Sequence, residues 1–148
     1  MSIIYGIDPG QERSAMVGWD GKKVVRPIEN TNQSILDWIK ATPDALIAIE
    51  HIRGYGLSAG NELFDTIFWS GRFFEAATLP PGLVCRKDIL WHLCDNRKAG
   101  DREVRAALLD RIGPKGTKKE PGPMFGISGT HLFSALAVAV TWYDQNIN

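Results

Sequence analysis

The sequence predicts an α/β fold in which a mixed five-stranded sheet is flanked by helices, in one domain spanning residues 1–148. Three short strand-like segments follow one another at the start of the chain, so an antiparallel meander is expected there. Two later apolar runs, residues 45–50 and 83–86, each follow a helical pattern and therefore join the sheet through crossovers. The 148 residues suffice for one real core and are too few for two ordinary domains.

The strands are predicted from apolar runs that end at turn signals. The first run ends in Asp-Pro-Gly at residues 8–10, and Asp20-Gly21 is a two-residue hairpin signal between the next two runs. The segment ALIAIE is apolar up to its last residue and too short for a helix, which is typical of a buried central strand. The expected strands are residues 2–8, 13–19, 22–28, 45–50 and 83–86.

The helices are predicted from apolar residues that recur at helical spacing. Pro43 ends the first helix, Pro80 and Pro81 end the second, and Asp101 is expected to cap the fourth. The expected helices are residues 32–41, 62–77, 88–93, 101–112 and 130–143. Residues 113–129 are rich in Gly, Pro and Lys and are expected to be mobile.

The composition excludes several classes of protein. Apolar residues make up 44% of the chain and charged residues 23%, which excludes a disordered tail and a fibre. Cys85 and Cys94 are too few for a disulfide framework and are expected to be reduced thiols. The start of the chain lacks the basic region of a signal peptide, and the late apolar stretch 132–142 is too short to span a bilayer.

Charge is balanced overall but unevenly placed. Seventeen basic residues match seventeen acidic ones, so the total gives no indication of nucleic acid. Residues 86–119, however, hold ten basic residues against five acidic ones. A basic surface beside an acidic site is the layout expected of a nuclease. Taken alone, the pattern is better explained by a solvated helix face and a charged loop.

Two carboxylates, Asp8 and Glu50, end predicted buried strands. The order of the elements makes these strands neighbours, so both carboxylates are expected at one end of the sheet. Such a pair is desolvated and self-repelling, and it persists mostly where a hard divalent cation neutralises it. The alternatives are an ordinary strand-end turn for Asp8 and a solvated side chain for Glu50.

His131 and Ser134 are the polar interruptions of the otherwise apolar last helix, and their spacing puts them on one face. A polar pair on a buried face needs partners. A histidine aimed at an acidic pair is a good metal ligand or general base. A lone histidine at such a position is more often a hydrogen-bonded core residue.

Four segments together resemble the RuvC family of Holliday junction resolvases, in the ribonuclease H-like superfamily. They are IYGIDPG, the strand ALIAIE with its terminal Glu, KAGDREVRAAL, and the late GISGTHLFSALAVAVTW. They occur in the family's order over nearly the whole chain. Each segment is weakly specific alone, and the four together are moderately specific.

The resemblance implies a ribonuclease H-like fold, a homodimer, and hydrolysis of phosphodiesters in four-way DNA junctions with Mg²⁺ or Mn²⁺, two ions per site. It implies that Asp8 bridges the ions, that Glu50 ligates the second, and that His131 ligates an ion or orients the attacking water. The expected location is the cytoplasm of a bacterial cell or of a phage-infected host.

Ser134 departs from the family pattern, because it stands where the last carboxylate is expected. The loss of one charge and one oxygen ligand leaves three interpretations: weakened or single-metal catalysis, rescue by another acid such as Asp101, or junction binding without cutting. An introduced change is a further explanation of the serine.

Candidates for DNA contacts follow from basic charge, and candidates for contacts with a second subunit follow from the Phe-rich helix expected at residues 62–77, which has more apolar surface than one sheet face needs. Arg53 and Tyr55, after Glu50, are candidates for backbone contact and base stacking, unless they belong to an ordinary flexible loop. The further DNA-binding candidates are Arg86, Lys87, Arg97, Lys98, Lys115, Lys118 and Lys119. The candidates for a two-fold dimer interface are Phe64, Phe68 and Trp69, with a fully buried core helix as the alternative.

Three other functions remain as alternatives. A ribonuclease H-like enzyme acting on RNA or RNA–DNA hybrids would differ in junction preference. A junction-binding protein without catalysis would bind tightly and not cut, which Ser134 makes plausible. An actin-like nucleotide-binding fragment also begins with an Asp-x-Gly turn, but the chain is too short for that two-lobed architecture.

Overall fold

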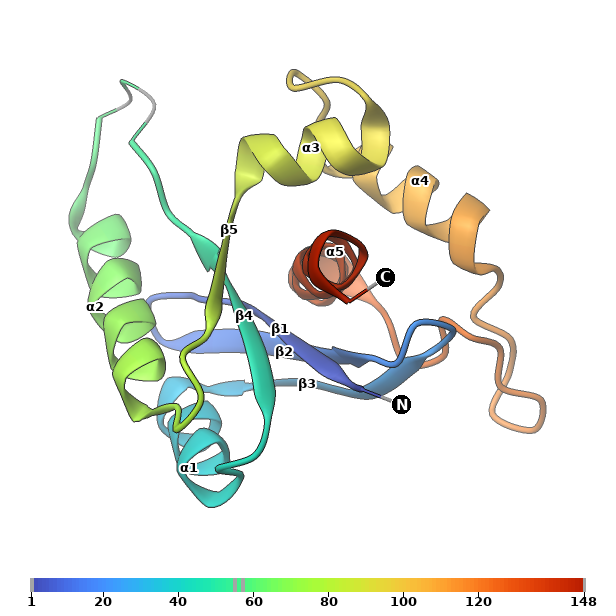
Figure 1. The fold of residues 1–148 in the computed structure, drawn as a ribbon. Helices are drawn as coiled ribbons and strands as arrows, with labels where there is room; N and C mark the ends of the chain where they lie inside the picture. Colours follow the sequence, from blue (N-terminus) through green and yellow to red (C-terminus); the bar gives the residue numbers. More distant parts are fainter. Residues whose placement is uncertain (1, 55, 57, 148) are drawn as a thin grey trace.

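The computed structural model describes residues 2–54, 56 and 58–147. Figure 1 shows a twisted sheet with helices on both faces, which confirms the predicted fold class. The elements are β1 (Ile4–Asp8), β2 (Arg13–Trp19), β3 (Val24–Thr31), α1 (Asn32–Ala41), β4 (Leu46–His51), α2 (Asn61–Ala76), β5 (Gly82–Cys85), α3 (Arg86–Cys94), α4 (Asp101–Ile112) and α5 (Gly129–Asn146).

The sheet has the strand order β3-β2-β1-β4-β5. β1, β2 and β3 form the antiparallel meander, while β4 pairs in parallel with both β1 and β5. Ile7 is the register partner of Ile49, so Asp8 and Glu50 follow at the same end of two adjacent central strands. The predicted neighbourhood of these two carboxylates is therefore confirmed. Pro27 is tolerated because β3 is an edge strand.

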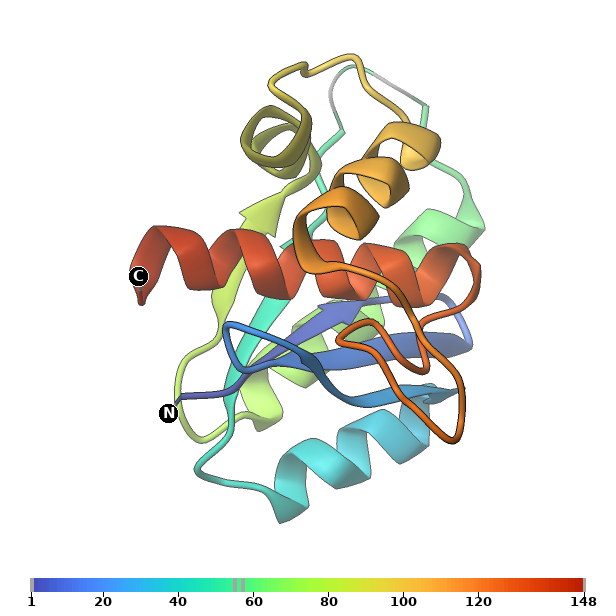
Figure 2. The ribbon, with the colours of Figure 1, turned by 90° about the vertical axis from the view of Figure 1, so that its right-hand side faces the viewer.

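Helices cover the sheet in two layers, and each layer encloses a separate core. On one face α5 lies across the sheet beneath α3 and α4, as Figure 2 shows. On the other face α1 and α2 cover a core that includes Ile35, Ile49 and the fully buried Phe73. α5 is apolar nearly all round because it is covered on both sides.

α5 approaches β1 so closely that only glycine fits at position 6. A Cβ on Gly6 would lie 2.2 Å from the carbonyl oxygen of Ala135 and 2.6 Å from the amide nitrogen of Ala139. The contact joins the strand that carries Asp8 to the helix that carries His131. The absent side chain at Gly6 therefore sets the distance between the two elements that form the site.

Several expected boundaries differ from the observed ones. Residues 20–23 form the turn between β2 and β3, where the carboxylate of Asp20 accepts hydrogen bonds from the backbone N–H groups of Lys22 and Lys23, each at 2.8 Å. The connection is therefore longer than a two-residue hairpin. The expected cap at Asp101 is also wrong, because Gly100 caps α4 and its N–H donates to Glu103 at 2.8 Å.

Residues 113–128 are docked on the body of the protein rather than loose. The backbone N–H of Val24 donates to the carbonyl of Pro123 at 2.8 Å. Met124 and Ile127 are buried in the α5-side core, at 0% and 1% exposure. The prediction of mobility is therefore wrong. It rested on the Gly, Pro and Lys content of the segment, which does not show that Met124 and Ile127 are buried.

Two smaller observations complete the fold. Both cysteines are free and partly buried. Among the helices in the described part of the chain, none is long and apolar enough to cross a membrane.

Candidate active site

The centre of the site is the carboxylate pair at the ends of the two central strands. Asp8 is the last residue of β1 and its side chain is only 14% exposed. Glu50 is partly buried near the end of β4, and its carboxylate has no hydrogen-bond donor among the described residues. The hydrophobic strands carry both groups to this position because their other residues belong to the two cores.

Burial makes both carboxyl groups hard to ionise, and the charge of Asp8 further opposes ionisation of Glu50. Burial raises the pKa of Asp8, and the hydrogen bond and charge of His131 partly offset that rise. Burial also raises the pKa of Glu50 to about 7, and the negative charge of Asp8 adds to the effect. A cation between them would relieve both causes. Both carboxyl groups are thus desolvated, as the sequence led us to expect.

α5 brings His131 against this pair. Its Nδ1 lies 3.1 Å from Oδ2 of Asp8, and the imidazole is 68% exposed. His131 is thus not a buried core histidine. Ser134, one turn further along α5, is partly buried, and its hydroxyl has no hydrogen-bond partner within the described structure.

Arg86 and Asp101 form an ion pair beside the carboxylates. Arg86 directly follows β5, whose Val84 is the register partner of Glu50. The charge of Arg86 lowers the pKa of both Asp8 and Glu50, and the charge of Asp101 raises it. The sequence suggested Arg86 only as a DNA contact, and nothing local to residue 86 or 101 indicates that they meet.

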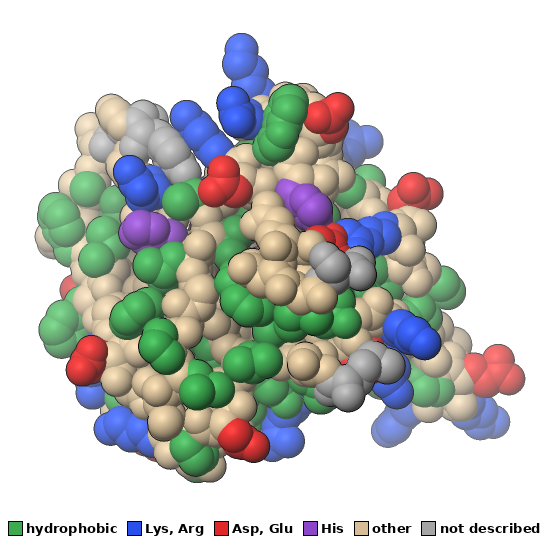
Figure 3. All heavy atoms as spheres, in the orientation of Figure 1, with side chains coloured by type: hydrophobic (Ala, Val, Ile, Leu, Met, Phe, Trp, Pro, Cys, Tyr) green, Lys and Arg blue, Asp and Glu red, His purple; other side chains and the backbone are tan. Residues whose placement is uncertain are grey.

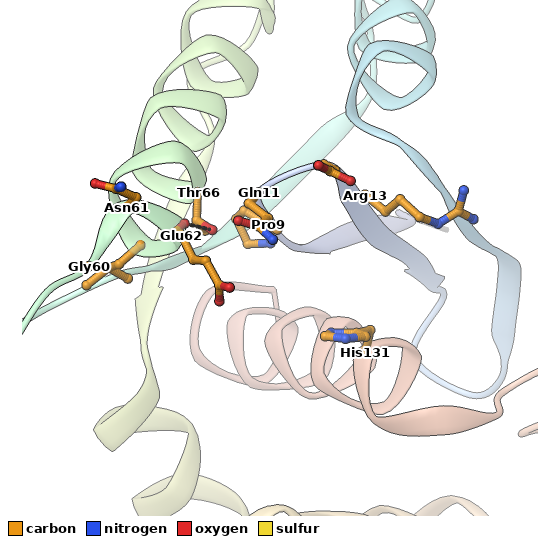
Figure 4. A pocket seen from close by; sticks show the side chains of 11 residues that line it. Pro9, Gln11, Arg13, Gly60, Asn61, Glu62, Thr66 and His131 are labelled. Atoms are coloured by element: carbon orange, nitrogen blue, oxygen red, sulfur yellow. Dashed lines mark hydrogen bonds between the residues drawn. The ribbon is translucent and has the colours of Figure 1, made fainter.

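An open cleft of about 800 Å³ leads to the site. It is lined by residues 9–13 of the turn after β1, by residues 60–63 and Thr66 of α2 and its N-cap, and by His131. Figure 4 shows Glu62 reaching from α2 toward the side of α5 that carries His131. The sequence analysis did not single out Gln11, Arg13 or Glu62. For Gln11 and Arg13 the available signal was their position just after Asp8.

A second, basic pocket of about 340 Å³ lies at the same end of the sheet. Its lining consists of Arg53, Cys85, Lys87, Asp88 and Arg97. Figure 3 shows Lys and Arg side chains gathered along the edge between the loop after β4 and α3. The structure thus brings together three of the predicted DNA-binding residues that lie far apart in the sequence.

The remaining DNA-binding candidates are spread more widely. Lys98, Lys118 and Lys119 are exposed. Lys115 lies over the ring of Phe133 at 5.4 Å from its centroid, so it is partly used in packing residues 113–128. Tyr55 lies outside the described residues.

α2 presents an apolar strip to solvent. Phe64 is 59% exposed and Phe68 is 64% exposed, whereas Phe73 on the opposite side is fully buried. Trp69 is partly buried, packs against the α1–α2 core, and lies under Arg72 at 4.3 Å from the ring centroid. A fully buried core helix is therefore excluded.

The residues at the centre suit a divalent cation. Asp8 and Glu50 offer hard carboxylate ligands whose pKa values are raised chiefly by burial, and His131 adds a nitrogen donor. The described residues contain no preformed group of three or more His, Cys, Asp or Glu side chains arranged to hold a metal. Closure around an ion would therefore need side-chain movement.

Comparison with known proteins identifies the fold. No family model matches the chain, and no curated protein matches it. The structure of RuvC from Thermus thermophilus superposes with a TM-score of 0.70 at 19% identity, covering 97% of this chain and 95% of that one. RuvC from T. thermophilus in complex with its Holliday junction substrate gives a TM-score of 0.72 at 19% identity, covering 95% and 92% of the two chains. The chain therefore has the fold of RuvC over nearly its whole length.

Proposed function

We propose that this protein is a divalent-metal-dependent DNA endonuclease that resolves four-way junctions. The observation that carries the proposal is the partly buried Asp8–Glu50 pair with His131 against Asp8, where His131 also lines an open cleft. The fold is that of a protein solved in complex with a Holliday junction. The carboxylates of Asp8 and Glu50 would repel a DNA phosphate unless cations are bound to them. The basic edge beside them suits the DNA backbone.

The roles of the residues follow from their contacts. Asp8, Glu50 and His131 would hold the metal, which when bound supplies water activation and neutralises charge on the scissile phosphate. Asp8 accepts a hydrogen bond from Nδ1–H of His131 and so fixes the orientation of the ring. Nε2 of His131 then keeps the ring's one free lone pair, which would either ligate the ion or orient the attacking water. The products would be a 5′-phosphate and a 3′-hydroxyl.

Basic residues would hold the junction arms on either side of the cleft. Arg53, Lys87 and Arg97 surround one pocket and suit backbone phosphates. Lys118 and Lys119 extend the basic surface from residues 113–128. This arrangement positions DNA without reading its sequence.

The test is cleavage of a labelled four-way junction in Mg²⁺ and in Mn²⁺, with linear duplex as competitor and Asp8→Asn as the control variant. Symmetric nicking that needs metal and is lost in Asp8→Asn supports the proposal. Binding without nicking would instead favour a non-catalytic junction-binding protein, a function that the neutral Ser134 also suits. If the protein neither binds nor nicks the junction, the proposal of a junction substrate is overturned.

We further propose that α2 mediates a homodimer, which would provide one site for each of two opposed strands. Phe64 and Phe68 form an exposed apolar strip. Sedimentation should show a dimer that Phe64→Ser combined with Phe68→Ser converts to monomer. Trp91→Ser, at a 52% exposed aromatic on α3, is the matched control and should leave the dimer intact. An unchanged dimer in the double variant would refute this interface.

A further inference from the structure

The Arg86–Asp101 ion pair lies at the rim of the site, where the Asp101 side chain is 56% exposed. Arg86 is the first residue of α3, two positions beyond the register partner of Glu50, and its side chain is 26% exposed. Asp101 is the first residue of α4, and its carboxylate accepts a hydrogen bond from the Arg86 guanidinium. The pair thereby fixes a positive charge at the end of the sheet where Asp8 and Glu50 meet.

This charge acts on both central carboxylates. Arg86 directly follows β5 at this end of the sheet, and its charge favours the ionised forms of Asp8 and Glu50. Asp101 influences both in the opposite direction. Arg86 is thus the resident counter-cation of the carboxylate pair, and Asp101 holds it there.

The neutral side chain of Ser134 lowers the negative charge that bound cations must balance in the site. The RuvC-like pattern leads one to expect a carboxylate at this place on α5, and a hydroxyl carries no charge. When ionised, the three carboxylates Asp8, Glu50 and Asp101 together with the single guanidinium of Arg86 sum to two negative charges. One divalent cation balances that sum, whereas two would leave the site with an excess of two positive charges in a partly buried place.

We propose that the site takes one divalent cation, held by Asp8, Glu50 and His131, and that Arg86 supplies the second positive charge. Asp101 uses one terminal nitrogen of the guanidinium. The other N–H groups remain as donors for a phosphate oxygen of the substrate. The proposal rests on the nuclease function proposed above and replaces the expectation of two ions with one.

The first test counts ions without DNA. Titration with Mn²⁺, followed by calorimetry and by electron paramagnetic resonance of free Mn²⁺, should give one ion per chain. Ser134→Asp should raise the count toward two, and Asp8→Asn should abolish binding. A count of two in the unaltered protein would overturn the proposal. Because no substrate is present, this outcome is independent of whether junctions are cleaved.

The second test separates the charge of Arg86 from its packing. Arg86→Gln should bind Mn²⁺ about tenfold more tightly, because a repelling charge is removed, yet nick junctions more slowly at saturating metal. Arg86→Lys should retain most of the activity. Lys40→Gln, at an exposed residue of α1 on the opposite face of the sheet, is the control and should leave Mn²⁺ affinity and nicking rate unchanged.

Opposite effects on affinity and rate are not produced by a residue that merely supports the fold. Weaker Mn²⁺ binding in Arg86→Gln, or unchanged binding and unchanged rate, would refute the role of Arg86. If no variant nicks any junction while the count remains one, the nuclease function fails and the single-ion site stands.

Discussion

Replacing Glu50 by Gln should stabilise the metal-free protein above neutral pH. The pKa of Glu50 rises from 4.5 to about 7 on folding, chiefly through burial and secondarily through Asp8. A carboxyl group with a raised pKa in the folded state contributes stability that is complete below its unfolded pKa and is lost as the pH rises to the folded pKa. At about 1.4 kcal/mol per pKa unit, the loss between pH 4.5 and 7 is about 3 kcal/mol.

Urea unfolding in the presence of EDTA measures this effect directly. The free energy of unfolding of the unaltered protein should fall by about 2 to 3 kcal/mol more than that of Glu50→Gln between pH 5 and pH 8. Part of the difference belongs to Asp8, because the two groups titrate as a coupled pair. Glu120→Gln, at an exposed residue, is the matched control and should follow the unaltered protein.

The same reasoning predicts rescue by metal. Saturating Mg²⁺ at pH 8 should restore the lost stability of the unaltered protein, because the ion binds the folded carboxylate pair and not the unfolded chain. Glu50→Gln should gain little. The reasoning is wrong if Glu50→Gln and the unaltered protein show parallel pH dependence, or if Mg²⁺ stabilises both equally.

Two further predictions concern the framework of the site. Gly6→Ala should cost at least about 2 kcal/mol of stability in urea unfolding and should separate His131 from Asp8 in NMR spectra, because its Cβ collides with the α5 backbone. Gly71→Ala, where a Cβ on α2 meets nothing within 4 Å, should instead stabilise by about 0.5 to 1 kcal/mol, and equal losses would contradict the close-packing argument. Asp144→Asn should lower stability by about 1 kcal/mol without slowing junction cleavage, because its carboxylate binds Arg111 at 2.5 and 2.8 Å and His92 at 2.7 Å near the end of α5 remote from His131. Thermal melts and cleavage rates check the last prediction, and a loss of activity at full stability would contradict it.

The local features of the fold were predictable because periodicity and turn residues act over short distances. β2, α1 and α4 occupy the expected ranges, and the remaining elements are shifted or extended by a few residues. The meeting of Asp8 and Glu50 also followed from the sequence, since the order of the strands and right-handed crossovers leave few topologies. Residues 113–128 escaped prediction because their anchoring depends on contacts with β3 and the core.

By itself, the sequence predicted which residues of the central strands and last helix belong to the candidate site: Asp8, Glu50, His131 and the neutral Ser134. Only the tertiary structure decided that Arg86 and Asp101 pair beside them and that α2 leaves Phe64 and Phe68 exposed. The physical reason is that hydrophobic patterning specifies which face of an element is buried. It does not specify which side chains of separate elements meet at the end of a sheet, because that depends on the packing distance and angle of each helix.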